Sequence, residues 1–168
     1  MSKVIFLAGL PAVGKSTLAR QIAKKHNGRV LDIDEIKRKL SDPNLVTSSI
    51  DTPEIRWRCY EEAAKQILQF FKDGEHVVIV DEVFHLNELR EKLETLLVSE
   101  DVEVTWIQVV CSFEEVQERL QSKSRIGHIL STDEALKMNI LFRDIFEPFP
   151  RNKSNHSVFH NDTSLSIV

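Results

Sequence analysis

The sequence is poor in cysteine. Only Cys59 and Cys111 occur among its 168 residues, and neither stands at a metal-ligand spacing from other ligating residues. This usage predicts two reduced, unpaired thiols and a cytoplasmic setting, and it argues against a fold held together by disulfides or by a cysteine-bound metal ion.

A surplus of positive charge and a long apolar run are also missing. The 22 basic and 26 acidic residues give a formal net charge of -4. A nucleic-acid-binding protein normally carries a basic face, so nucleic acid is not an expected partner, although a small polyanion can still bind locally. No apolar run approaches the roughly 20 residues that span a bilayer, so no membrane partner is expected. Residues 1–14 resemble a signal peptide, but Gly9, Pro11 and Gly14 interrupt the apolar stretch, and we interpret it as a strand and its loop.

Internal repeats, low-complexity tracts and linkers are absent as well. The remaining composition, 42% apolar and 29% charged, is that of an ordinary globular protein. A chain of this length can bury one good core and has no room for a second domain of any size. We therefore expect residues 1–168 to form one domain.

Residues 9–17 read GLPAVGKST and match the phosphate-binding pattern G-x-x-x-x-G-K-[ST]. Gly9 and Gly14 let the backbone turn tightly and direct its N–H groups at phosphate oxygens. Lys15 supplies a mobile charge for the terminal phosphates, and the Ser16 hydroxyl can ligate a magnesium ion. The pattern predicts a nucleoside triphosphate site (the P-loop) built from Gly9, Ala12, Val13, Gly14, Lys15, Ser16 and Thr17.

Strand-like and helix-like segments alternate along the chain. The expected strands are Lys3–Ala8, 29–33, 76–80, 102–110 and 157–160. The expected helices are Lys15–His26, 35–40, about 53–72, 86–98, one that Ser112 caps, and 131–146. Gly28 is expected to end the first helix, and Asp51 with Glu54 to begin the third. This alternation predicts an α/β fold in which helices cover both faces of a parallel sheet, with the ligand beyond the carboxyl ends of the strands.

Acidic residues follow the second and third strands. Asp32 and Asp34 alternate at the end of strand 29–33, which places both on one side. We assign Asp34 to hold and deprotonate an acceptor hydroxyl, and Asp32 to hold magnesium through its water. Asp34 could instead cap the next helix, and both roles are compatible. Asp81 and Glu82 end the run VVIVDE; Asp81 is a second candidate for magnesium, unless the pair only caps the helix that follows.

A basic segment lies between the last two predicted helices. It contains Arg119, Lys123, Arg125 and His128. A flexible basic segment could close over the triphosphate and neutralise charge that develops during transfer, although a solvated turn is the alternative. We therefore take Arg119 and Arg125 as candidate catalytic residues of a lid at about 119–130, with Arg143 as a further basic residue near it.

Basic and aromatic side chains also occur in an acceptor-side region at about 35–60. Lys37 and Arg38 could meet an anionic substrate or be plain surface charges. Arg56, Trp57 and Arg58 could line an acceptor pocket, although a tryptophan on an apolar helical stripe is more typical of a core.

The loop GLPAVGKST, the Asp-x-Asp after the second strand and the arginines after the fourth resemble the small P-loop kinases. That group includes shikimate and gluconate kinases, chloramphenicol phosphotransferase, zeta-toxin-like kinases and AAA-domain kinases. The resemblance implies a P-loop NTPase fold, a three-layer sandwich whose five-stranded parallel sheet has the order 2-3-1-4-5. It also implies ATP and Mg²⁺ at the loop, an acceptor-activating aspartate at Asp34, lid arginines like Arg119 and Arg125, and adenine near Asn161, Asp162 and Thr163.

The chain departs from named members of that group at its acceptor side. Lys37 stands where many relatives carry the arginine of Asp-x-x-Arg, and Asp81-Glu82-Val83-Phe84 replaces the glycine-rich run of shikimate kinases. The leading hypothesis is an ATP-dependent kinase, a monomer or weak dimer, that phosphorylates a hydroxyl of a small molecule which the sequence does not identify. The alternatives are a nucleotide-dependent hydrolase or switch that acts through a partner, and a nucleoside or nucleotide kinase.

Overall fold

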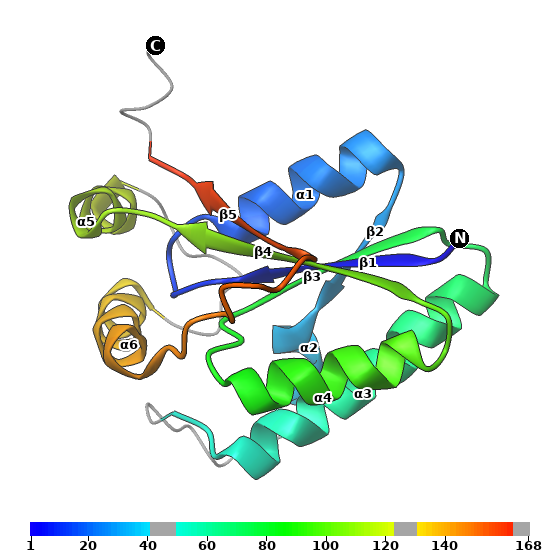
Figure 1. Cartoon of the computed structure of the whole chain (residues 1–168). Coiled ribbons are helices and arrows are strands. Elements are labelled where there is room, and N and C mark those ends of the chain that lie inside the picture. The colour runs from blue at the N-terminus through cyan, green and yellow to red at the C-terminus, as the bar shows by residue number, and fades with distance from the viewer. Residues whose placement is uncertain (41–49, 123–130, 163–168) are drawn as a thin grey trace.

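The computed structural model describes residues 1–40, 50–122 and 131–162, and its centre is a parallel sheet (Figure 1). The strands are β1 (Lys3–Ala8), β2 (Arg29–Asp32), β3 (Val77–Glu82), β4 (Glu103–Val110) and β5 (His156–His160). They lie in the order β2-β3-β1-β4-β5, and every neighbouring pair is parallel. The predicted sheet order is therefore confirmed.

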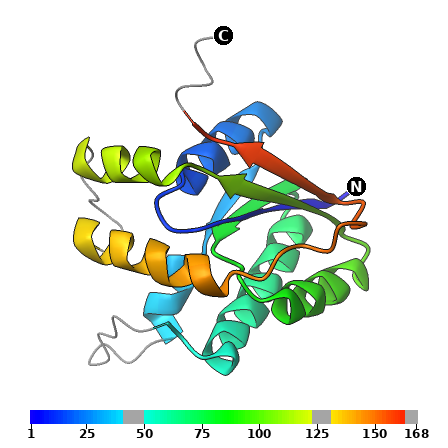
Figure 2. The ribbon, with the colours of Figure 1, turned by 60° about the vertical axis from the view of Figure 1, so that its left-hand side comes forward.

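Helices cover both faces of this sheet. They are α1 (Lys15–His26), α2 (Ile33–Leu40), α3 (Pro53–Lys72), α4 (Asn87–Val98), α5 (Phe113–Ser122) and α6 (Thr132–Ile145). Figure 1 shows α1 on one face and α3 and α4 on the other, while α5 and α6 lie side by side at the carboxyl end of the strands in Figure 2 as well. This confirms the expected three-layer α/β sandwich.

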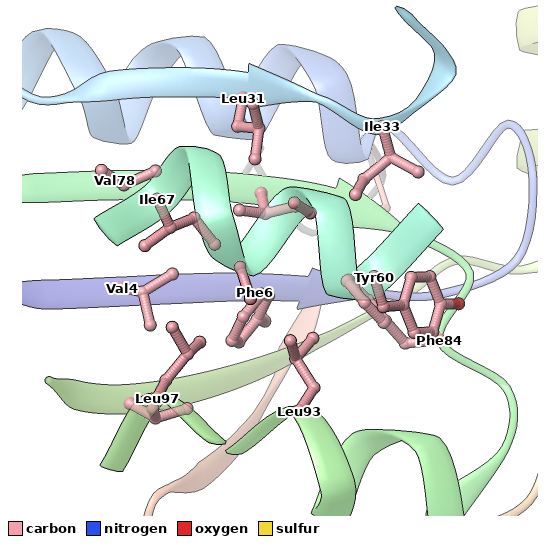
Figure 3. Close-up of a cluster of buried hydrophobic side chains, with 14 of the residues drawn as sticks. Val4, Phe6, Leu31, Ile33, Tyr60, Ile67, Val78, Phe84, Leu93 and Leu97 are labelled. Carbon is pink, nitrogen blue, oxygen red and sulfur yellow. The ribbon is translucent and has the colours of Figure 1, made fainter. Parts of the chain in front are cut away.

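The central strands are buried on both faces, as their unbroken apolar runs predict. On one face Val78 and Val80 of β3 pack with Phe6 of β1 against α3 and α4 (Figure 3), whereas Ile79 and Leu7 belong to the cluster under α1. Each such side chain contributes roughly 1.5–3 kcal/mol on burial. This packing fixes the carboxyl ends of β1 and β3, where the P-loop and the acidic residues lie.

Several boundaries differ from the sequence predictions for reasons of capping. Strand β2 ends at Asp32, whose Oδ1 accepts the amides of Asp34 (2.9 Å) and Glu35 (3.3 Å). The expectation that Asp32 and Asp34 alternate on one strand was wrong, because Asp32 caps α2 and Asp34 lies in its first turn. Likewise, Asn27 rather than Gly28 takes the left-handed turn after α1, and Thr52 rather than Asp51 caps α3.

Arg90 on α4 joins two segments that are distant in sequence. Its guanidinium donates to the Phe84 carbonyl (2.7 Å) and to those of Glu147 (2.8 Å) and Pro148 (3.2 Å). Phe84 has a positive φ of 49°, which is uncommon for an aromatic residue and has to be held by its surroundings. Arg90 therefore fixes the turn after β3 against the chain that follows α6.

None of the helices in the described parts of the chain is long and apolar enough to cross a bilayer.

Candidate active site

The P-loop connects the end of β1 to α1. Its first amide, that of Gly9, donates to the Val83 carbonyl (3.2 Å), which ties the loop to the chain after β3. The Lys15 Nζ donates to the carbonyls of Gly9 (2.8 Å) and Leu10 (2.7 Å), so the ammonium lies inside the curve of its own loop. From there it can exchange carbonyl oxygens for phosphate oxygens with little movement of the backbone.

Gly14 occupies a position that no other residue fits. Its φ is 95°, and a Cβ added there would lie 2.2 Å from Asn161 Nδ2 and 2.9 Å from Arg119 Nη1. Both the backbone conformation and the close approach of two side chains therefore require glycine.

Side chains from three distant elements hold the outside of the P-loop. The Val13 carbonyl accepts from Arg119 Nη1 (3.0 Å) on α5 and from Asn161 Nδ2 (2.9 Å) after β5. Asn139 of α6 donates to the Pro11 carbonyl (2.7 Å). These contacts, a brace made by Arg119, Asn139 and Asn161, position the loop from the carboxyl edge of the sheet.

Of the residues predicted for the lid and for adenine, the structure describes some and not others. Arg119 also donates to Asn161 O (2.5 Å) and to Glu115 Oε1 (3.1 Å), which places it at the end of α5 against the P-loop. Asp162 Oδ1 accepts the amide of Ser112 (2.9 Å) at the start of α5. Arg125 and Thr163 lie outside the described residues, as do Lys123 and His128.

The structure brings the three predicted metal-binding residues together. Ser16 Oγ donates to Asp81 Oδ2 (2.9 Å), and Asp32 lies opposite Asp81 in the register of β2 and β3. Burial raises the pKa of Asp81, with Lys15 and Ser16 opposing the rise. Hydroxyl and carboxylate oxygens are the ligands that Mg²⁺ prefers.

A closed protein cage for an ion is absent from residues 1–40, 50–122 and 131–162, because no three His, Cys, Asp or Glu side chains gather there as ligands. That fits Mg²⁺, which usually binds one or two carboxylates and takes its other ligands from phosphates and water. Ser16 and Asp81 could hold it, whereas Asp32 already accepts two backbone hydrogen bonds at Oδ1.

Asp34 lies among other acidic groups on the acceptor side. Its carboxyl is half-buried, and burial followed by the charges of Glu82, Asp32 and Asp81 raises its pKa to about 6. Lys37 opposes the rise. A carboxylate with such a pKa is ionised at neutral pH and is more basic than an ordinary aspartate, which suits a general base.

Beside Asp34, the acceptor side contains two pairs of opposite charges. Lys37 of α2 pairs with Asp51 just before α3. Arg56 of α3 lies 3.8 Å from Glu82 at the end of β3, and its guanidinium lies 5.1 Å from the Phe142 ring.

The other aromatic and basic candidates lie elsewhere. Trp57 packs against the Lys92 ammonium (4.0 Å) between α3 and α4, and Arg58 is exposed. Arg143 donates to Asn139 Oδ1 (3.1 Å), so it supports the brace.

Sequence reasoning missed Asn139, whose side chain holds the P-loop at Pro11. Asn139 could have been found, because it stands on the apolar stripe of α6 with Ala135 and Phe142, where a polar residue needs a partner.

The P-loop, the Ser16–Asp81 contact and the sheet order can be compared with known proteins. Residues 4–140 match the model of a protein family described as AAA domain. The chain belongs to this family. No curated protein matches it.

Solved structures share the fold of this AAA-domain chain at low sequence identity. A gluconokinase from Sinorhizobium meliloti 1021 is 16% identical with a TM-score of 0.68, covering 95% of this chain and 82% of its own. A sugar kinase from Janibacter sp. HTCC2649 is 17% identical with a TM-score of 0.70, covering 95% and 86%. The APS kinase of Mycobacterium tuberculosis, in complex with AMPPNP and APS, is 18% identical with a TM-score of 0.60, covering 94% and 88%. The chain therefore has the fold of the small P-loop kinases.

Proposed function

We propose that the protein is an ATP-dependent phosphotransferase that moves the γ-phosphoryl group of ATP to a hydroxyl of a small molecule. The observation that carries this proposal is the position of Asp34. It lies within electrostatic reach of Glu82, Asp32 and Asp81, on the same edge of the sheet as the P-loop, with a pKa raised to about 6. The kinase fold of its structural relatives supports the same reaction class.

In the proposed reaction, the acceptor oxygen bonds to the γ-phosphorus while the bond from that phosphorus to the bridging oxygen breaks. The hydroxyl proton passes to an Asp34 carboxylate oxygen, and ADP leaves with the electrons of the broken bond. Lys15 leaves the carbonyls of Gly9 and Leu10 for the phosphate oxygens, where its charge stabilises the transferring group. Bound Mg²⁺ would neutralise phosphate charge, and Ser16 and Asp81 are the residues to hold it.

In this proposal Arg119 positions the P-loop and does not itself contact the acceptor. Its contact with the Val13 carbonyl holds the P-loop in position for the phosphates. We retain Arg125 as a candidate lid arginine that stabilises the transferring group, and residues 161–163 as the place for adenine.

The rival function is a nucleotide-dependent hydrolase or switch in which Glu82 activates water. The contacts of Glu82 favour the kinase: its Oε1 accepts the Val83 amide (2.7 Å) and faces Arg56, so that oxygen is already engaged. A nucleoside or nucleotide kinase would differ only in the acceptor.

ATP consumption with and without hydroxylated compounds tests the proposal. The panel contains sugars, polyols, nucleosides and sugar nucleotides, and ADP release is followed in a coupled assay. We expect slow hydrolysis alone and a rise of about 100-fold or more with one acceptor class, because an in-line hydroxyl replaces a poorly oriented water.

Two variants distinguish kinase from hydrolase. Asp34→Asn should abolish the stimulated rate, and Glu82→Gln should leave slow basal hydrolysis in place. Fast hydrolysis that needs no acceptor, is lost in Glu82→Gln and persists in Asp34→Asn would contradict the proposal.

A further inference from the structure

Three buried polar atoms on the acceptor side make no hydrogen bond of good geometry with any described residue, although the Tyr60 hydroxyl and the Arg56 guanidinium lie within reach of each other. They are Arg56 Nε, Tyr60 Oη and His85 Nδ1. Their side chains are only 6%, 1% and 3% exposed. A buried donor or acceptor without a partner is costly, and several in one place usually mean that a further polar molecule completes them.

These groups belong to one cluster. Phe142 of α6 touches both Arg56 (5.1 Å to the ring centroid) and His85 (4.9 Å between ring centroids). Glu82 lies 3.8 Å from Arg56, and its charge raises the pKa of both Tyr60 and Asp34 after the larger effect of burial. The cluster therefore adjoins the carboxylate that we propose as the general base.

The cluster lies toward the carboxyl ends of the strands. Figure 3 shows Tyr60 beside Phe84 at the end of the apolar cluster to which the strand arrowheads point, with its oxygen directed away from the apolar side chains. The two ring centroids are 5.0 Å apart. The Tyr60 hydroxyl therefore lies at the end of the apolar cluster nearest the carboxyl ends of the strands, still enclosed by the protein.

The donors and acceptors of the cluster indicate its ligand. Arg56 Nε–H donates, the Glu82 carboxylate accepts, and the protonated Tyr60 hydroxyl can do both. Burial lowers the pKa of His85 to about 4, so its imidazole is neutral at pH 7 and also offers one donor and one acceptor. Hydroxyl groups, which donate and accept at one atom, fit such a mixed set.

The charges disfavour an anionic ligand. Glu82 faces the Arg56 guanidinium, and Asp51 pairs with Lys37, so each of these two cations already has a carboxylate beside it. Asp34 adds a negative charge at neutral pH. A carboxylate or phosphate on the acceptor would meet no net positive charge here, whereas a neutral hydroxyl would not need one.

We propose that Arg56, Tyr60, Glu82 and His85 form a subsite for the hydroxyls of a neutral polyhydroxylated acceptor, a sugar or cyclitol, next to the hydroxyl that receives the phosphoryl group. This assignment rests on the proposed kinase function and narrows its acceptor class.

The test compares acceptors that differ mainly in charge. D-Glucose, D-ribose and myo-inositol represent neutral acceptors, D-gluconate and D-glucuronate anionic ones, and D-glucosamine a cationic one. Phosphoryl transfer from ATP is followed by ADP release and ³¹P NMR in the wild type, in Tyr60→Phe and in Arg56→Gln. Arg58→Gln, an exposed arginine two residues away on α3, is the matched control.

Tyr60→Phe is the sharpest variant, because it removes only the hydroxyl and keeps the ring that packs against Phe84. We expect its KM for the neutral acceptor to rise about 10-fold, while the KM for ATP and the Tm stay as in the wild type. Arg56→Gln should raise the same KM further, and Arg58→Gln should change none of these values.

The possible outcomes separate the subsite from the kinase function. Transfer to an anionic acceptor in preference to neutral ones, or an unchanged acceptor KM in Tyr60→Phe, would overturn the subsite and leave a kinase. A lower Tm with an unchanged KM would assign the cluster to internal water and likewise overturn it. Bound ATP with no transfer to any compound would contradict the kinase function, and the subsite with it.

Discussion

At the P-loop the polar groups of the site are held by other parts of the chain, whereas on the acceptor side several of them have no such partner. Arg119 and Asn161 share the Val13 carbonyl, and Ser16 donates to Asp81. Across the same edge of the sheet, Arg56 Nε and His85 Nδ1 are buried without a hydrogen-bond partner among the described residues.

The difference concerns which contacts hold the polar groups of each half of the site in position. A loop that is fixed by its own chain is ready for the phosphates before they arrive and loses little entropy on binding. In the proposed subsite, Arg56 Nε and His85 Nδ1 are held among aromatic rings and would gain their hydrogen bonds from the acceptor. Substitutions in the two halves should therefore have different kinetic effects.

The largest effect should come from Lys15→Ala, which removes a positive charge that the P-loop carbonyls of Gly9 and Leu10 enclose. We expect kcat/KM to fall by about 100- to 1,000-fold, because the charge on the transferring group loses a close cation. Steady-state kinetics with saturating acceptor measure this. Lys24→Ala, exposed on the same helix, is the control; a loss of less than tenfold in Lys15→Ala would place the catalytic charge elsewhere.

Asp34→Asn should affect chemistry without affecting the nucleotide. The amide keeps the shape of the side chain but cannot take a proton, so kcat should fall about 100-fold or more while the Kd for ATP stays constant. Single-turnover kinetics and calorimetry give the two quantities separately. If the Kd for ATP weakened in proportion to kcat, Asp34 would belong to the nucleotide side.

The pH dependence should follow the raised pKa of Asp34. Because the base acts when ionised, kcat/KM should rise about tenfold per pH unit up to about pH 6 and then level off, and this limb should vanish in Asp34→Asn.

Stability should respond to pH in the opposite direction. The folded pKa of about 6 exceeds the ordinary 3.8, so the folded state binds the proton more tightly and its stability falls as pH rises from about 4 to 6, by about 1–3 kcal/mol. Asp34→Asn should thus have the higher Tm at pH 7, and thermal melts across this range measure it. An unchanged Tm would mean that the carboxylate is solvated.

The smallest effect should come from Asn161→Ala, which removes one of two donors from the Val13 carbonyl. Arg119 still holds that oxygen, so the Kd for ATP should rise only about 5- to 10-fold, with the acceptor KM unchanged. Isothermal titration with a nonhydrolysable ATP analogue measures the change, and exposed Asn152→Ala serves as the control. A change in the acceptor KM instead would mean that the two halves are not independent.

The nucleotide half was predictable from sequence because its residues are consecutive. Nine adjacent residues define the P-loop, and the strand before it and the helix after it follow from the local apolar pattern. The sheet order followed from the family resemblance and is confirmed. Helix ends were only partly predictable. The last helix begins where the sequence indicates, with Ser131 as its cap, but the end of β2 depends on its pairing with β3, which local sequence does not specify.

The acceptor half was less predictable because it is assembled from distant residues. The pKa of Asp34 is raised first by burial and then by carboxylates from β2 and β3 that lie near the first turn of α2. The same holds for one contact of the nucleotide half, since Asn139 and Pro11, which it joins, are 128 positions apart. Such neighbours depend on how helices lie on the sheet, and the period of a helix gives its buried face but not its partner.

Arg90 has a consequence for how the molecule opens. Its guanidinium joins the turn after β3 to the backbone at Glu147 and Pro148, the Glu147 amide donates to His85 O (2.9 Å), and Glu147 Oε2 accepts the Asn87 amide (2.8 Å). Neither segment can separate without breaking the other's contacts, so these amides should exchange with deuterium together, as one cooperative unit. The stability of the chain beyond α6 would then determine how often the turn that carries His85 opens and how fast its amides exchange.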